Sequence, residues 1–179
     1  MIILVDQDDT LADYHGHVLK MWQTEYPRAV CKAFAEHEHW ETPLNYPEED
    51  RTRIHQITLR NGFFRNLPLL PGAKEGLEFL LEAGHEVRIV TSPKIEHTPC
   101  VPEKYAWVET HLGKEWVKRL MVTYDKTFVH GDLLIDDKPH IRGARTPAWE
   151  HVLFDRPYNQ TVRDTRRITW FNFKEVLGL

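Results

Sequence analysis

The chain has 179 residues, of which 41% are hydrophobic and 28% charged, and its formal net charge is −4. This composition excludes a disordered chain, which has few apolar residues and a high net charge, and the length suits one domain with a modest insertion. The mildly acidic balance argues against a nucleic-acid polymer as partner, although it allows a single nucleotide as ligand.

The cysteine content and the apolar runs bear on location. Cys31 and Cys100 stand in no metal-ligand or CxxC spacing, which indicates a reducing compartment, and we expect a cytoplasmic protein. The opening run Met1–Val5 is too short for a signal peptide and lacks basic flanks. No apolar run approaches the ~18 residues that a membrane span requires, so we expect no membrane partner.

Five short apolar runs predict β-strands. The first, Ile2–Val5, is a continuous β-prone run, as in a strand that is buried on both faces of a parallel sheet. The other four runs are Glu86–Val90, Arg119–Thr123, Asp132–Ile135 and His151–Phe154.

Helical patterns lie between these runs. They cover Leu11–Tyr26, Pro71–Ala83, Glu103–Leu112 and Trp116–Leu120. Pro71 and Gly84 are conventional limits for the second of them. Strands that alternate with helices indicate an α/β protein with a doubly wound parallel sheet.

A long segment separates the first strand from the helix that begins near Pro71. It is too long for a plain connection, and it contains a helical pattern of its own. We therefore predict a small helical cap over residues 14–66, inserted after the first strand. Residues 1–13 and 67–179 would form the catalytic core.

Polar side chains follow three of the predicted strands. They are Asp6 and Asp8 after the first, Thr91 and Ser92 after the second, and Asp136 and Asp137 after the fourth. The first group belongs to the stretch VDQDDT, which has three carboxylates within four residues and no Lys or Arg before Lys20 to neutralise them. Because like charges repel, a bound cation is expected there.

These residue types together fit one kind of chemistry. The carboxyl ends of the strands in such a sheet lie at one edge, and Lys104 can reach that edge from the following helix. A carboxylate nucleophile, an acid/base, hydroxyl and ammonium donors, and carboxylates for a hard cation are the parts of phosphoryl transfer. A helix N-cap before Leu11 is the alternative for the first acidic group, but one capping residue would suffice.

The DxDxT pattern at residues 6 to 10 resembles that of the haloacid dehalogenase-like phosphatases. Longer blocks are similar to the 5′(3′)-deoxyribonucleotidases of that superfamily: TSPKIEHTPCVPEKYAWVE (91–109), DKTFVHGDLLIDDKPHIRGARTPAWEHVLF (125–154), LADY after the first motif and PGA at 71–73. The similarity runs from about Ile2 to Phe154. Residues 28–62 and the tail beyond Asp155 are only loosely comparable.

The resemblance implies a role for each matching residue. Asp6 would attack phosphorus, and Asp8 would protonate the leaving oxygen and then activate water. Thr91, Ser92 and Lys104 would bind the phosphate, with Lys104 also offsetting the charge of Asp6. Mg²⁺ would be held by the carboxylates of Asp6 and Asp136 and the carbonyl of Asp8, with Asp137 acting through water.

Some positions depart from the family or match it weakly. Asp9 and Thr10 stand where the nucleotidases have Gly-Val, and we favour a loop role over metal binding for Asp9. Tyr14 aligns with an aromatic residue that stacks on the base. Trp40 lies near another by spacing alone, and a core role is equally open for it.

Several further residues could belong to the site or could have a purely structural position. Lys94, Lys138 and Arg142 either line the entrance of the site or are solvated. We interpret Asp125-Lys-Thr127 as a loop. The pairs His15/His17 and His37/His39 fit no zinc spacing and are expected to be solvated on the surface.

The expected function is therefore Mg²⁺-dependent hydrolysis of (deoxy)nucleoside monophosphates, above all pyrimidine 5′(3′)-deoxyribonucleotides, through an aspartyl-phosphate. One alternative is a phosphatase for another small phosphate ester such as a sugar phosphate. Another is a receiver-type signalling domain, but a receiver has its acidic pair first and its acceptor later, the reverse of the order here. The expected partner is a nucleotide, and a homodimer is left open.

Overall fold

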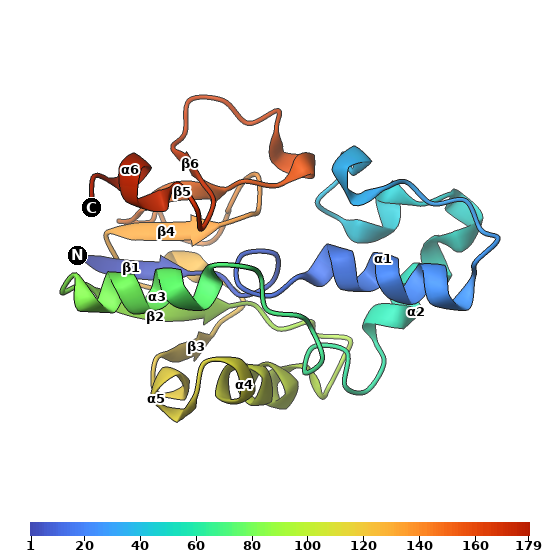
Figure 1. Ribbon diagram of the computed structural model, residues 1–179, viewed down its shortest axis with the longest axis horizontal. Helices are drawn as coiled ribbons and strands as arrows, with labels where there is room; N and C mark the ends of the chain where they lie inside the picture. The colour runs from blue at the N-terminus through green and yellow to red at the C-terminus, as the bar shows by residue number, and fades with distance from the viewer.

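The computed structural model describes residues 1–179, and its centre is a six-stranded parallel sheet in the order β3-β2-β1-β4-β5-β6 (Figure 1). The strands are β1 (Ile2–Val5), β2 (Glu86–Thr91), β3 (Leu120–Val122), β4 (Leu133–Asp136), β5 (Glu150–Phe154) and β6 (Arg167–Ile168). The predicted doubly wound α/β fold is confirmed. Five strands lie where the apolar runs predicted them, and β6 was not predicted.

Six α-helices accompany the sheet: α1 (Tyr14–Glu25), α2 (Arg51–Thr58), α3 (Ala73–Glu82), α4 (Cys100–His111), α5 (Lys114–Val117) and α6 (Phe173–Leu177). Five 3₁₀ turns complete the structure: η1 (Phe34–Glu36), η2 (Thr42–Asn45), η3 (Glu48–Asp50), η4 (Lys126–Phe128) and η5 (Pro157–Asn159). None of the helices combines the length and the apolar composition that crossing a membrane requires.

Three helix limits differ from the sequence pattern by three residues, and the others by fewer. Helix α1 begins at Tyr14 and not at Leu11, because Leu11 and Ala12 instead donate to the carbonyl of Gln7 and close a tight turn, each at 2.8 Å. Helix α4 begins earlier than predicted, at Cys100. Helix α5 ends at Val117, so the last part of the predicted Trp116–Leu120 helix is a turn at residues 118–119 followed by Leu120, the first residue of β3.

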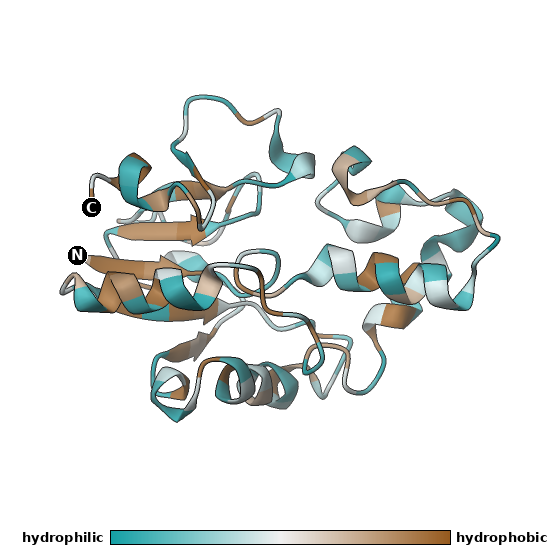
Figure 2. Cartoon of the chain, in the orientation of Figure 1, coloured by the Kyte–Doolittle hydropathy of each residue, from teal (hydrophilic) through white to brown (hydrophobic).

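The two faces of the sheet are packed unequally. Ile3 and Val5 belong to a cluster of 29 buried apolar residues that also holds Leu77 of α3. Leu4 points to the other face, where the buried cluster has four members. Figure 2 shows the strands as the most hydrophobic part of the chain, which is the pattern expected of parallel strands covered on both faces.

Residues 14–66, called the inserted segment below, lie beyond the carboxyl ends of the strands, while both termini lie at the opposite end of the molecule (Figure 1). Val18, Trp22 and Ile54 of this segment are fully buried in the same apolar cluster as the strands. The segment therefore shares its core with the sheet. The division into a cap and a catalytic core stays a prediction.

The direction of the chain across the sheet reverses next to β1. From β1 the chain goes to β2 and β3 on one side, and β4, β5 and β6 follow on the other. Val5 pairs with Ile135, and the amide of Asp6 donates to the carbonyl of Ile135 at 2.8 Å. Such a switch point opens a crevice at the carboxyl ends of the two strands, which here bear Asp6 and Asp136.

Candidate active site

A pocket of about 630 Å³ lies at this crevice, walled on one side by the strand ends and on the other by the inserted segment. All the residues predicted for the site except Lys104 line it: Asp6, Asp8, Tyr14, Trp40, Thr91, Ser92, Asp136 and Asp137. Lys94, Lys138 and Arg142 also line it, so the pocket has a basic rim around an acidic floor.

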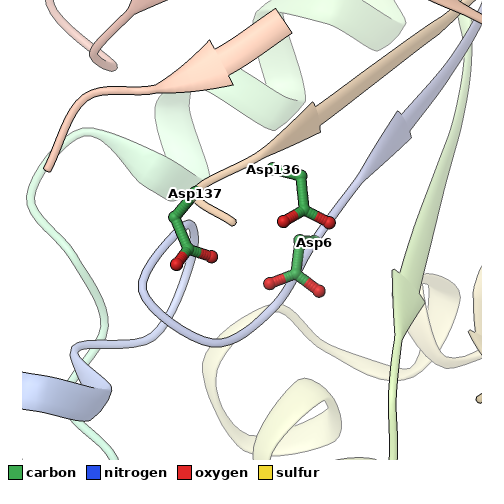
Figure 3. A group of neighbouring side chains, drawn as sticks. All are labelled: Asp6, Asp136 and Asp137. Atoms are coloured by element: carbon green, nitrogen blue, oxygen red, sulfur yellow. The ribbon is translucent and has the colours of Figure 1, made fainter. Parts of the chain in front are cut away.

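Three carboxylates form the floor of the pocket. Asp6, Asp136 and Asp137 each offer an oxygen that lies within 4.8 Å of the others, and all three residues are buried. Figure 3 shows the carboxylates of Asp6 and Asp136 side by side at the ends of their strands, with Asp137 facing them. Buried carboxylates at this spacing need a cation to offset their repulsion.

Lys126 supplies part of that positive charge. Its Nζ atom donates to Asp136 at 2.6 Å and also contacts the carboxylate of Asp6. The 3₁₀ turn that carries it is held by Asp125, whose side chain accepts from the amide and the hydroxyl of Thr127 at 2.8 and 2.6 Å. The motif lies in the connection between β3 and β4, as our interpretation of it as a loop requires, but we did not predict that Lys126 reaches the site. The position of Lys126 inside a family-matching block was the signal that pointed to the site.

The charges of the floor remain unbalanced after Lys126 is counted. Burial raises the pKa of Asp6 to about 7, against the lowering effect of Lys126 and with a further rise from Asp136. Burial also raises the pKa of Asp137 well above its usual range. Burial alone would lower the pKa of Lys126, but its two carboxylate partners raise it overall. Three carboxylates against one ammonium group fit a site for a hard divalent cation with oxygen ligands.

Lys104 forms a direct ion pair with Asp8, which was not predicted. Its buried Nζ donates to Asp8 at 2.6 Å and to the hydroxyl of Thr91 at 2.7 Å. It makes no ion pair with Asp6, which is paired with Lys126, but the charge of Lys104 also lowers the pKa of Asp6, as the expected offset requires. The other oxygen of Asp8 is buried without a hydrogen-bond partner in the protein, and it remains open to a proton or a ligand.

Asp9 fixes the loop between β1 and α1. Its φ of 56° lies in the left-handed region, which glycine adopts more readily than other residues. The carboxylate accepts from the amides of Tyr14 and His15 at 3.0 and 3.1 Å, and it also contacts the ring of His15 and the hydroxyl of Tyr158. These contacts leave Asp9 no oxygen for a metal, in agreement with the loop role. The N-cap of α1 is Asp13, whose side chain accepts from the amide of Gly16, so the N-cap alternative does not apply to Asp6 or Asp8.

The expectation that the paired histidines are solvated was wrong for two of them. His15 and His37 are buried, with exposed fractions of 2% and 1%. The ring of His15 stacks on that of Tyr158, with centroids 4.6 Å apart. The burial of His15 was not predicted, because its stacking partner Tyr158 lies in the tail beyond Asp155, which matched the family only loosely.

Two aromatic residues of the inserted segment face the pocket. The ring of Tyr14 packs edge-on against Phe63, with centroids 5.3 Å apart. Trp40 is 36% exposed, and the Nζ atom of Lys138 lies 4.2 Å from the centre of its ring. The core role that we left open for Trp40 is therefore wrong.

Comparison with known proteins identifies the family. The family described as "5′ nucleotidase, deoxy (Pyrimidine), cytosolic type C protein" matches residues 1–178. The chain belongs to this family. The human cytosolic 5′(3′)-deoxyribonucleotidase is 35% identical over 185 residues, covering 98% of this chain and 92% of that protein. A protein of Bordetella pertussis is 44% identical over 178 residues, covering 99% and 96%.

The predicted nucleotidase family, and with it a phosphomonoester hydrolase, is thus confirmed, and the receiver-type alternative is excluded. The match also extends over the tail beyond Asp155, which had appeared only loosely comparable. Among solved structures, a HAD family hydrolase from Deinococcus radiodurans has a TM-score of 0.58 at 15% identity and covers 99% of this chain and 94% of its own. That likeness concerns the fold alone.

Proposed function

We propose that the protein hydrolyses pyrimidine deoxynucleoside monophosphates with the help of Mg²⁺, through an aspartyl-phosphate on Asp6. The observation that carries the proposal is the separate pairing of the two catalytic carboxylates. Asp6 sits with Lys126 in the carboxylate cluster, whereas Asp8 sits with Lys104 outside it. The two groups thus have the different surroundings that a nucleophile and an acid/base require.

The residues that would hold Mg²⁺ are Asp6, Asp136 and Asp137, together with the backbone carbonyl of Asp8. Oxygen ligands with a net negative charge are the set that Mg²⁺ prefers. A solved haloacid dehalogenase-like hydrolase of Bacillus subtilis, with a TM-score of 0.58 to this chain, is bound to magnesium. When bound, the ion would offset the negative charges of Asp6 and the phosphate as they approach each other.

In the first step, an oxygen of Asp6 bonds to phosphorus as the ester bond to the nucleoside oxygen breaks. Asp8 donates a proton to that leaving oxygen through its unpartnered carboxyl oxygen. Thr91 and Ser92 lie on the pocket wall at the end of β2 and are placed to donate hydrogen bonds to phosphate oxygens.

In the second step, Asp8 has given up its proton and acts as a base. It takes a proton from a water molecule, whose oxygen attacks the phosphorus of the phosphorylated Asp6. The bond between phosphorus and Asp6 breaks, phosphate leaves, and the carboxylate is restored. Between the two steps, the ammonium group of Lys104 offsets the negative charge of Asp8, and that of Lys126 offsets the negative charge around Asp6.

The inserted segment is proposed to be the cap that selects the substrate. Tyr14 and Trp40 would stack on the base, and stacking on an aromatic face contributes on the order of 1–3 kcal/mol. A ribose 2′-hydroxyl buried against this wall without a partner would cost free energy. We therefore expect dUMP and dTMP to be hydrolysed better than UMP, and much better than a sugar phosphate. We further propose a cytoplasmic location, as for the cytosolic human relative.

A screen of phosphate release tests the proposal. Nucleoside monophosphates with and without the 2′-hydroxyl, purine and pyrimidine, are compared with sugar phosphates in the presence of Mg²⁺ and after its removal by chelation. The expected result is Mg²⁺-dependent release with the highest kcat/KM for dUMP and dTMP. Equal kcat/KM for sugar phosphates would contradict the proposed substrate class, and full activity after chelation would contradict the metal.

A further inference from the structure

Asp137 is held at two points by two adjacent residues of the C-terminal segment. The hydroxyl of Tyr158 donates to one carboxylate oxygen of Asp137 at 2.7 Å. The side-chain amide of Asn159 donates to the backbone carbonyl of Asp137 at 2.8 Å. Both holding residues are buried, with exposed fractions of 4% and 0%. One oxygen of Asp137 is thus committed, and the other is left to face the carboxylate cluster.

Tyr158 is itself held by a residue of the inserted segment. Its ring stacks on His15 at an angle of 30°, and its hydroxyl lies 3.2 Å from the carboxylate of Asp9. The Nδ1 atom of His15 contacts the same carboxylate, and its Nε2 atom lies 3.1 Å from the hydroxyl of Thr42. A continuous line of contacts therefore runs from Thr42, on the pocket wall, through His15 and Tyr158 to Asp137.

The donors and acceptors along this line match one another. The ring of His15 has a partner at each nitrogen, the carboxylate of Asp9 at Nδ1 and the hydroxyl of Thr42 at Nε2. The single hydroxyl hydrogen of Tyr158 is directed at Asp137, which is the shorter of its two contacts. Each of these side-chain groups is buried and has a partner, which is the condition under which a buried polar network holds its members in one arrangement.

We propose that Tyr158 and His15 are positioning residues for the metal site. Tyr158 fixes the orientation of the Asp137 carboxylate, and His15 fixes Tyr158 and ties it to Thr42 of the inserted segment. The inference rests on the proposed function, because it takes Asp137 as part of a cation site. Hydrogen-bond partners behind metal ligands typically change metal affinity by about 10- to 100-fold when they are removed.

The test is the affinity of the metal-free protein for Mg²⁺, measured by calorimetric titration without substrate. Tyr158→Phe removes one oxygen atom and keeps the ring on His15. Tyr46→Phe is the matched control, since Tyr46 is equally buried, at 3%, and its hydroxyl has no partner in the protein. We expect Tyr158→Phe to bind Mg²⁺ about 10- to 100-fold more weakly than wild type, and Tyr46→Phe to bind it as wild type does.

A third variant tests the connection to the inserted segment. Thr42→Val removes only the hydroxyl that reaches His15, and we expect a smaller drop in Mg²⁺ affinity than in Tyr158→Phe. Thermal unfolding of the metal-free proteins checks that all three variants fold. Wild-type affinity in Tyr158→Phe would overturn the inference and leave the proposed function standing. Wild-type affinity in Thr42→Val alone would overturn the tie to the inserted segment, and a wild-type protein that binds no Mg²⁺ would overturn both the inference and the proposed function.

Discussion

The two ends of the pocket are lined by different types of side chain. At the core end, buried carboxylates and ammonium groups are paired at hydrogen-bonding distance, as Lys126 is with Asp136 and Lys104 with Asp8. At the end formed by the inserted segment, the wall is aromatic and hydroxylic, and one of its ties to the core is the exposed pair of His55 and Glu96, 3.8 Å apart. Exposed pairs of this kind contribute only about 0–1 kcal/mol. The proposed function divides the pocket in the same way, with the chemistry at the core end and the selection of the substrate at the other.

If this division is correct, the largest effect will come from Asp6→Asn. An amide is a poor nucleophile, and it also weakens the metal site, so kcat should fall by several orders of magnitude for every phosphate ester. Steady-state kinetics on dUMP and on an aryl phosphate measure this, with circular dichroism to check folding. Appreciable turnover of either ester would remove Asp6 from the mechanism.

Asp8→Asn should have the next largest effect. Both chemical steps need proton transfer by this residue, which typically contributes about 10²–10⁴-fold to the rate. Mg²⁺ affinity should fall much less than turnover, because the backbone carbonyl of residue 8 is unchanged. A parallel collapse of turnover and calorimetric Mg²⁺ affinity would show that the side chain of Asp8 belongs to the metal site.

Tyr14→Ala should separate the two ends of the pocket. Loss of stacking is expected to lower kcat/KM on dUMP by roughly ten- to a hundredfold, with little change on an aryl phosphate that has no base. Tyr14→Phe, which keeps the ring, is the control and should behave as wild type. An equal loss on both esters would mean that Tyr14 supports the fold against Phe63 and does not contact the base.

The pH dependence of metal binding should give the smallest effect. Because the pKa of Asp6 is raised to about 7, the carboxyl below that pH carries a proton that Mg²⁺ must displace. Mg²⁺ affinity should therefore rise by about tenfold from pH 6 to pH 8 and then level off. Calorimetric titrations at several pH values measure this, and Tyr14→Ala should show the same slope. A flat profile would place Asp6 outside the metal site.

The same raised pKa has a consequence for stability. The folded metal-free protein holds a proton on Asp6 that the unfolded chain, with a pKa near 3.8, has released. The contribution of this group to stability is therefore present at low pH and is lost as pH rises from about 4 to about 7. Urea unfolding of metal-free wild type and of Asp6→Asn should show a steeper dependence in wild type, while Asp137, whose pKa is also raised, keeps part of the dependence in the variant.

Sequence reasoning was sufficient for the residues at the strand ends. Asp6 and Asp136 follow apolar runs that only a buried parallel strand explains, and the carboxyl ends of such strands meet at the switch point. The fold class, the pocket location and the family blocks all agreed on these positions. That these residues meet in one pocket at the strand ends was therefore predictable from the amino-acid sequence alone.

The supporting residues were not predictable in the same way. Lys126 meets Asp6 across 120 positions of the chain, and Trp170 donates to the carbonyl of Thr10 across 160. Such contacts leave no local periodicity or spacing in the sequence. Tyr158 also lies in the tail that matched the family loosely. The strand β6 has only two residues, which is too short for a pattern.

The most direct test of the account is to locate the phosphoryl group on the enzyme. Wild type, Asp8→Asn and Asp6→Asn are each mixed with dUMP and Mg²⁺, quenched and reduced with borohydride, which converts an aspartyl-phosphate to homoserine. Peptide mass spectrometry then identifies the modified position. The account predicts homoserine at position 6 alone, with more of it in Asp8→Asn and none in Asp6→Asn. Homoserine at another position, or its absence while dUMP is being consumed, would contradict the account.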